Sequence, residues 1–310
     1  MNAVRDGAVS PPRGHDRVDG FASALLVALC LSWGLNHVSI KIANEGIQPI
    51  FQSGLRSALG TVLIFGWCWL RGLPLFARDG TLIAGIVAGT LFGLEFLLVY
   101  LALDYTTVSR AVIFLYLTPF MVAVGAHVFL PGERLTLVKS LGLIAAFSGV
   151  VLVFSDELSL PSPAALIGDA MSVVAAAFWA ATIIVIKATA LKDAAPEKVL
   201  IYQLGVSAVI LLAAAPLFGP LLRDVTPLVV GALAYQVIVV VSVSYVAWFW
   251  LIRHYPAAKL SAFTFLTPIF GVMFGAMLLA EPISPRLLVA LALVAFGIYL
   301  VNRPQQSRLV

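Results

Sequence analysis

Long runs of apolar residues constrain this chain more than any other feature of its sequence. A helix rises 1.5 Å per residue, so about 20 apolar residues cross the roughly 30 Å hydrocarbon core of a membrane. Of the 310 residues, 61% are hydrophobic and only 11% are charged, whereas a soluble domain carries about a quarter charged residues. The sequence therefore predicts an all-α membrane protein with ten transmembrane helices, at 21–42, 49–70, 81–103, 107–130, 135–154, 164–186, 196–217, 226–252, 257–280 and 285–301.

The basic residues between these runs predict the orientation of the chain. With the amino terminus placed inside, fourteen Lys and Arg residues fall on the cytoplasmic side and four on the external side, and Arg56 lies within a helix. Such an excess follows the positive-inside rule, and the start of the chain lacks the pattern of a cleaved signal peptide. We expect a multi-pass protein of the bacterial inner membrane, with cytoplasmic tails at 1–20 and 303–310 and an external loop at 155–163.

A six-residue motif near the end of each half indicates an internal duplication. Residues 114–119 read FLYLTP, and residues 263–268 read FTFLTP. A glutamate, Glu133 or Glu281, then comes just before the helix that follows each copy. The match therefore extends over the last two helices of both halves.

The beginning of each half repeats as well. Trp33 precedes Lys41 by eight positions, and Trp179 precedes Lys187 by eight. Because each copy holds five helices, an odd number, the second copy must enter the membrane from the opposite side. Inverted halves that exchange conformations around a site near the midplane are typical of alternating-access transporters. The sequence predicts two such repeats, at 21–154 and 164–302.

These features give the chain a family resemblance over roughly residues 20–302. It resembles the drug/metabolite transporter superfamily, in the ten-helix group with two EamA repeats. The resemblance implies a central cavity lined by helices one to four and six to nine, and the transport of amino acids and other metabolites, mostly by export. The layout is also similar to that of bacterial riboflavin transporters, so the substrate stays open. The residues that carry the resemblance are Trp33 and Gly34, Arg56, the Thr-Pro pairs at 118–119 and 267–268, Glu133 and Glu281.

Two charged residues within the predicted helices are the first candidates for a binding site. Arg56 and Glu95 lie at similar depth below the external ends of their helices. A charge in hydrocarbon costs about 2.5 to 3.5 kcal/mol on insertion scales, so such residues face a cavity or pair with each other. Arg56 matches a substrate carboxylate in two hydrogen bonds, with Glu95 receiving an amine or a proton. The alternative is a structural ion pair between the two.

The corresponding positions in the second half are Gln203 and Ser244, which are polar but uncharged. A site that recognises charge would therefore be asymmetric and weighted to the first half. Further residues that we expect to line the substrate site are Trp33, Asn36, Tyr116, Trp179 and Tyr245. Asp169 is interpreted instead as an interfacial residue near the start of its helix.

Two prolines and two lysine–glutamate pairs are candidates for moving parts. Pro119 and Pro268 lie inside helices, where proline removes a backbone hydrogen bond and bends the helix, so we expect symmetric kinks that act as hinges. We also expect two opposed ion pairs at the periphery or at the gates: Lys41 with Glu281 outside, and Lys187 with Glu133 inside.

Several classes of protein are disfavoured by what the sequence lacks. It contains no HExxH pair, no G-x-S-x-G elbow and no Walker A motif, so we expect neither an enzyme nor an ATP-driven pump, and no cofactor or metal. Its basic residues form no stripe that would bind nucleic acid.

The expected function is secondary transport, most simply export of small metabolites such as amino acids. The alternatives are an importer of a cofactor-type metabolite such as riboflavin and, more distantly, an intramembrane enzyme. The expected partners are the small-molecule substrate and membrane lipid, with the chain a monomer or a homodimer.

Overall fold

The computed structural model describes residues 18–73, 75, 77–102, 105–155, 162–279 and 286–303, and it places no side chain for residues 108, 109 and 279. Within these ranges the secondary structure is helical, apart from one isolated β-bridge between Ile47 and Leu222. The prediction of an all-α protein is confirmed.

The helices of the first half follow the predicted spans closely. They are α1 (Gly20–Gly46), α2 (Pro49–Leu70), α3 (Leu82–Ala102), α4 (Val108–Leu115), α5 (Thr118–Phe129) and α6 (Leu137–Phe154). Polar caps begin several of them; for example, the side chain of Gln48 accepts a hydrogen bond from the amide of Phe51, with Pro49 as the first helical residue. A proline at this position loses no hydrogen bond, since the first amides of a helix have no partner within it.

The second half repeats this order. It contains α7 (Pro163–Ala188), α8 (Pro196–Ala214), α9 (Pro227–Tyr235), η4 (Gln236–Ser244), α10 (Tyr245–His254), α11 (Ala257–Phe263), α12 (Leu266–Leu279) and α13 (Arg286–Asn302), with short 3₁₀ turns at Ala190–Asp193 and Ala215–Phe218. α9, η4 and α10 together occupy one predicted span, and η4 is a π-helix.

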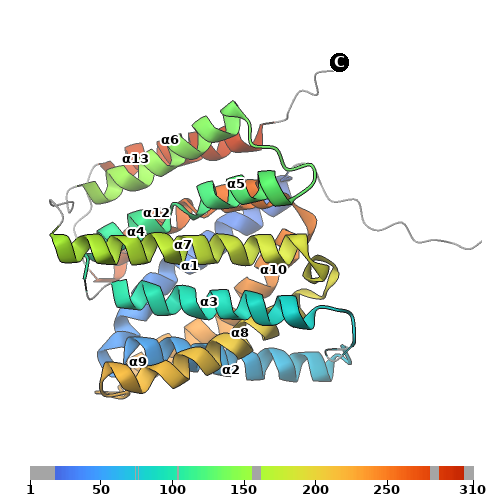
Figure 1. Cartoon of the computed structure of the whole chain (residues 1–310). Coiled ribbons are helices and arrows are strands. Elements are labelled where there is room, and N and C mark those ends of the chain that lie inside the picture. Colours follow the sequence, from blue (N-terminus) through green and yellow to red (C-terminus); the bar gives the residue numbers. More distant parts are fainter. Residues whose placement is uncertain are drawn as a thin grey trace, which may run out of the picture.

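Corresponding helices of the two halves pack against each other in opposite directions. Along α6 and α13, Gly142 lies against Gly297, whereas Gly149, further along α6, lies against Ala290, which is earlier in α13. Figure 1 shows this pair at one edge of the bundle, with α2 and α8 at the opposite edge. The small glycines let the backbones approach closely, as in other membrane helix pairs.

The same reversal holds at the opposite edge. Gly54 of α2 lies against Leu212 of α8, and Gly60 of α2 lies against Leu204. An antiparallel arrangement of corresponding helices is what an inverted duplication requires. In the rest of the text, the amino-terminal end of the bundle means the end where α1, α3 and α8 begin and α2 ends.

Both Thr-Pro motifs break their helices, as predicted. The break between α4 and α5 falls at residues 116–117, and the break between α11 and α12 falls at 264–265. Pro119 has no amide to donate to the carbonyl of Leu115, and the hydroxyl of Thr118 donates to that oxygen instead, at 2.7 Å. The side chain thus satisfies the acceptor that the proline leaves free.

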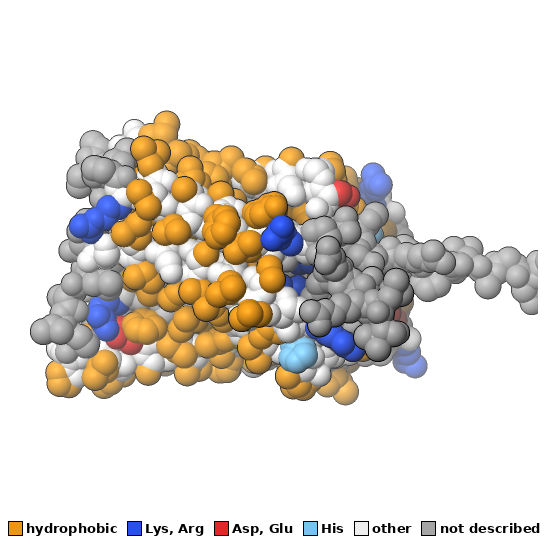
Figure 2. All heavy atoms as spheres, turned by 90° about the horizontal axis from the view of Figure 1, so that it is seen from above, with side chains coloured by type: hydrophobic (Ala, Val, Ile, Leu, Met, Phe, Trp, Pro, Cys, Tyr) orange, Lys and Arg blue, Asp and Glu red, His pale blue; other side chains and the backbone are white. Residues whose placement is uncertain are grey.

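The described surface is that of a membrane protein. Eight of the described helical segments are long and apolar enough to cross a bilayer, and α13 is a shorter apolar helix. Figure 2 shows hydrophobic side chains over most of one long face, with charged side chains mainly toward its ends. The chain is therefore a multi-pass membrane protein; α2, which carries Arg56, and α13 would bring the spans to the predicted ten, a number that stays a prediction.

Candidate functional site

Arg56 lies in the middle of α2 and is almost completely buried, with 1% of its surface exposed. The carbon at the centre of its guanidinium group is 4.5 Å from the centroid of the Phe96 ring on α3. Its Nε and Nη2 atoms have no hydrogen-bond partner among the described residues. A cation–π contact stabilises a desolvated arginine by about 2 kcal/mol, but it leaves these two donors unsatisfied.

Glu95 is the residue just before Phe96, and it is buried as well. In the described part of the chain it forms no ion pair with Arg56, and its Oε2 atom has no hydrogen-bond partner. Successive residues point about 100° apart around a helix, so an arginine that lies over Phe96 does not face Glu95 directly. Among the described residues, the alternative of a structural ion pair is therefore not formed, and Arg56 and Glu95 are two separately buried groups within electrostatic range of each other.

A layer of buried polar side chains lies on the face of α2 that carries Arg56. On α2, Gln52, Ser53, Arg56 and Ser57 are spaced three and four residues apart, so they share one face of the helix, and all are buried. Unpaired polar atoms inside a protein are rare, and each usually marks strain, function or an unobserved water or ligand. Among the described residues, the buried atoms without a hydrogen-bond partner include Gln52 Oε1, Ser53 Oγ and Ser57 Oγ on this face of α2, and, on other helices, Asn36 Oδ1, Trp248 Nε1 and both amide atoms of Gln203.

Aromatic contacts join Arg56 to three of the other predicted site residues, and a hydrogen bond adds a fourth. The Phe96 ring contacts Phe92, with centroids 5.0 Å apart, and Phe92 contacts both Tyr245 and Trp179. Trp33 packs edge-on against Tyr245 and donates a hydrogen bond from its indole nitrogen to Ser244 Oγ at 2.8 Å. The structure therefore brings Trp33, Trp179, Ser244 and Tyr245 into one cluster with Arg56 and Glu95.

Gln203 and Tyr116 lie apart from this cluster. Given the antiparallel neighbours along α2 and α8, Gln203 lies roughly 7 Å further along the bundle axis than Arg56, at 1.5 Å per residue. Tyr116 sits at the first helix break and packs against Phe265 at the second, with centroids 6.2 Å apart. These two residues correspond in the repeat, so the breaks that carry Pro119 and Pro268 meet each other inside the bundle.

The π-helix η4 is a part of the site that the sequence did not reveal. Gln236, at its start, accepts a hydrogen bond from Gln52 at 3.1 Å and donates one to the backbone of Ser39. Ser242 donates to the carbonyl of Val237, five residues earlier. π-helical turns are frequent at functional sites. Five consecutive β-branched residues at 237–241, which crowd an α-helical turn, were the available signal.

Of the two predicted lysine–glutamate ion pairs, only the one between Lys187 and Glu133 lies within the described residues. Lys187 Nζ lies 3.3 Å from Glu133 Oε1, and the same carboxylate accepts the amides of Ala257 and Ala258 at the start of α11. Glu281, the expected partner of Lys41, lies outside the described residues. Whether either pair acts as a gate stays a prediction.

Asp169, which we interpreted as interfacial, is buried and paired. Its carboxylate binds the guanidinium of Arg110 and accepts the hydroxyl of Thr106 at 2.8 Å. The pair joins the start of α7 to the start of α4, and the Asp169 carboxylate is therefore already bound to protein groups.

Comparison with known proteins gives consistent results. The sequence profile of the EamA-like transporter family matches residues 20–155 and again residues 166–303. The uncharacterized transporter YoaV of Bacillus subtilis (strain 168) is 24% identical over 277 residues, which are 89% of this chain and 94% of that protein. A probable amino-acid metabolite efflux pump of Escherichia coli (strain K12) is 25% identical over 301 residues, covering 92% of this chain and 94% of the pump. A solved crystal structure shares the fold, with a TM-score of 0.79 at 18% identity over 92% of this chain and 97% of that one.

The apolar helices and the buried polar layer define an integral membrane protein of the drug/metabolite transporter type. The chain belongs to the EamA-like transporter family, whose profile covers both of its halves. The family and the names of its relatives point to transport rather than to catalysis.

Proposed function

We propose that this protein is a secondary transporter that exports small metabolites bearing a carboxylate, such as amino acids, by alternating access. The observation that carries the proposal is the buried Arg56 guanidinium, two of whose nitrogens have no hydrogen-bond partner among the described residues. Leaving a charged donor unpaired in an apolar interior is costly. A carboxylate that accepts two hydrogen bonds from the guanidinium fork would remove this cost.

The groups near Arg56 fit the other two parts of an amino acid, its ammonium group and its side chain. Glu95 carries a buried oxygen without a partner, and it offers a counter-charge to an ammonium group. The aromatic side chains of Phe92, Tyr245 and Trp33 contact one another beside Phe96 and would provide apolar surface for a side chain. The relative from Escherichia coli whose printed name is a probable amino-acid metabolite efflux pump supports both this substrate class and export.

The mechanism that we propose depends on the inverted arrangement of the two halves and on the contact between their helix breaks. The reversed packing of α2 on α8 and of α6 on α13 supports inverted repeats. The excess of Lys and Arg on one side of the ten predicted spans supports cytoplasmic termini, and the bacterial relatives support a bacterial membrane. The two breaks at the Thr-Pro motifs contact each other through Tyr116 and Phe265. Bending at these breaks would open one end of the bundle while closing the other.

Reconstitution into liposomes tests the proposal. The purified protein would be assayed with labelled amino acids, nucleosides and flavins, with and without a pH gradient. We expect transport of a carboxylate-bearing compound, no transport of the same compound with the carboxylate converted to an amide, and a loss of roughly 10- to 150-fold in Arg56→Gln, because a charged hydrogen-bonded contact is worth about 1.5 to 3 kcal/mol.

Arg71→Gln is the matched control, since Arg71 is an exposed arginine at the end of the same helix. Equal transport by Arg56→Gln and Arg71→Gln would contradict the carboxylate site. Transport of riboflavin alone would instead favour a flavin carrier, with the ring stacked on the aromatic cluster around Trp33.

A further inference from the structure

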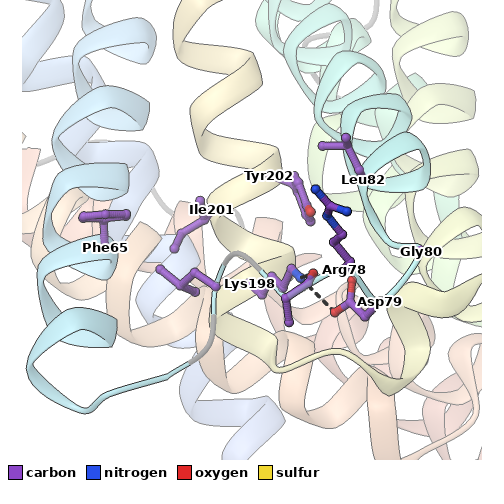
Figure 3. Close-up of a pocket in the computed structure, with 10 residues that line it drawn as sticks. Phe65, Arg78, Asp79, Gly80, Leu82, Lys198, Ile201 and Tyr202 are labelled. Carbon is purple, nitrogen blue, oxygen red and sulfur yellow. Dashed lines mark hydrogen bonds and ion pairs between the residues drawn. The ribbon is translucent and has the colours of Figure 1, made fainter.

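A second site lies away from the Arg56 layer, at the amino-terminal end of the bundle. It is a cavity of about 340 Å³ between the end of α2, the beginning of α3 and the beginning of α8. Figure 3 shows that Phe65 comes from α2 and that Lys198, Ile201 and Tyr202 come from α8, while Arg78 and Asp79 reach the cavity from the connection before α3. Both halves of the protein therefore contribute to its wall.

The polar end of this cavity has one net positive charge, because it holds two basic side chains and one carboxylate. Lys198 Nζ donates to Asp79 Oδ2 at 2.8 Å and to the carbonyl of Ala77 at 3.1 Å. The hydrogen bond from Lys198, with a second one from Thr81, lowers the pKa of Asp79 to about 2, so this aspartate is ionised at neutral pH and offsets the lysine. Among the described residues, Arg78 has no carboxylate partner.

The apolar end of the cavity opens toward lipid. Phe65 is 40% exposed and Leu82 is 60% exposed on the outside of the bundle, and together with Ile201 they form an apolar wall. A small hydrophilic anion gains nothing from such a wall, whereas a hydrocarbon chain does.

Exposed tryptophans show where the membrane surface lies relative to the cavity. Trp67 and Trp69, immediately after Phe65 on α2, are 51% and 80% exposed, and the guanidinium of Arg71 lies over the Trp67 ring. Tryptophans on the outside of membrane helices gather at the level of the lipid headgroups. The cavity, one turn away along α2, is therefore at headgroup depth.

From these observations we infer that the cavity is a binding site for an anionic phospholipid. Its phosphate lies between Arg78 and Lys198, and an acyl chain runs out along Phe65, Ile201 and Leu82. Because α2 and α3 belong to the first half and α8 to the second, the bound lipid joins the two halves at this end. The site is distinct from the Arg56 layer, and it does not depend on which solute is transported.

Native mass spectrometry of the full chain in detergent, titrated with phosphatidylglycerol or phosphatidylcholine, tests this inference. We expect one tightly bound phosphatidylglycerol and weaker binding of phosphatidylcholine. Arg78→Gln should weaken phosphatidylglycerol binding about fivefold, the usual effect of one basic residue near an anionic membrane surface. Arg71→Gln, which removes an equal charge outside the cavity, should change it less than twofold.

Two further variants separate the cavity from general surface charge. Asp79→Asn removes the negative charge beside Lys198 and should tighten phosphatidylglycerol binding, and Ile201→Trp fills the apolar wall and should abolish it with the charges intact. Thermal unfolding of each variant shows whether it is folded before binding is compared. Equal weakening in Arg78→Gln and Arg71→Gln, or no tightening in Asp79→Asn, would overturn the lipid site. Displacement of the lipid by glycerol phosphate or inorganic phosphate at similar concentration would overturn it in favour of a site for free anions.

Discussion

The second helices of the two halves, α2 and α8, have the same design but different chemistry. Each begins with a proline, Pro49 or Pro196, and each carries a buried polar residue seven positions later. In α2 that residue is Arg56, and in α8 it is Gln203. The repeat has thus preserved the scaffold and the polarity of the position, while the charge belongs to one half only. A symmetric fold here holds an asymmetric site.

The third helices differ in shape as well as in charge. α3 is a continuous helix whose Gly85, Gly89 and Gly93 lie against α8. Its counterpart is interrupted by the π-helix η4, which directs Gln236 toward Gln52 and ends at Ser244 beside Trp33. The first half supplies charge and close packing, and the second supplies neutral polar groups on an irregular helix.

Exchanging the charge between the halves should have the largest effect. The double variant Arg56→Gln/Gln203→Arg keeps the composition and moves the guanidinium from α2 to α8, roughly 7 Å along the bundle axis. In the second half, the residue that corresponds to Glu95 is Ser244 on η4, which carries no charge. We expect transport to stay as low as in Arg56→Gln alone, roughly 10- to 150-fold below the native protein. Uptake into liposomes measures it, and recovery of native transport would mean that the two positions are equivalent.

Substitutions in the third helices of the two halves should have a smaller effect, which we expect on the free energy of unfolding. A Cβ atom at Gly89 would lie 2.5 Å from the backbone oxygen of Tyr202, which cannot move easily, whereas one at Gly231 of α9 would meet nothing within 4 Å. We expect Gly89→Ala to lower the free energy of unfolding by about 1 to 3 kcal/mol. Gly231→Ala should raise it by about 0.5 to 1 kcal/mol. Thermal unfolding in one detergent compares them, and similar melting temperatures would show that α3 is not tightly seated on α8.

Replacing the prolines at the two helix breaks should have the smallest effects on transport, and the effects should be similar in the two halves. Because Tyr116 and Phe265 contact each other across them, we expect Pro119→Ala and Pro268→Ala each to slow transport a few-fold without lowering the melting temperature, since alanine restores helical hydrogen bonding. Substrate counterflow gives the rate. A slower rate in only one variant would assign the motion to one half, and unchanged rates in both would remove the hinge hypothesis.

Much of the fold could be predicted from the sequence because the solvent of this protein is hydrocarbon. A backbone in lipid must satisfy its own hydrogen bonds, so long apolar runs become helices whatever surrounds them. The range 49–70 coincides with α2, and the predicted breaks at the Thr-Pro motifs follow from the missing amide of proline. The repeat of short motifs also indicated which helices correspond.

The site was predicted less completely, because contacts between helices depend on how each helix is rotated. Arg56 and Glu95 were found from their charge, but whether they pair could not be predicted; among the described residues they form no ion pair, since Arg56 lies over Phe96 instead. Phe92 and Phe96 gave no signal among the many aromatic residues of the chain. The stripe of Gln52, Ser53, Arg56 and Ser57 is visible in the sequence as a spacing of three and four residues, and it could have shown which face of α2 points inward.

The sequence by itself determined that this chain lies in a membrane, where its helices begin and bend, and that its two halves are copies, because hydrophobicity, proline and repetition act locally along the chain. Only the tertiary structure decided which side chains meet. It placed Trp33 on Ser244, joined Arg56 to Tyr245 through two phenylalanines, and set Arg78 beside Lys198 around a cavity. These contacts depend on the rotation and depth of helices packed from opposite halves, which no single segment specifies.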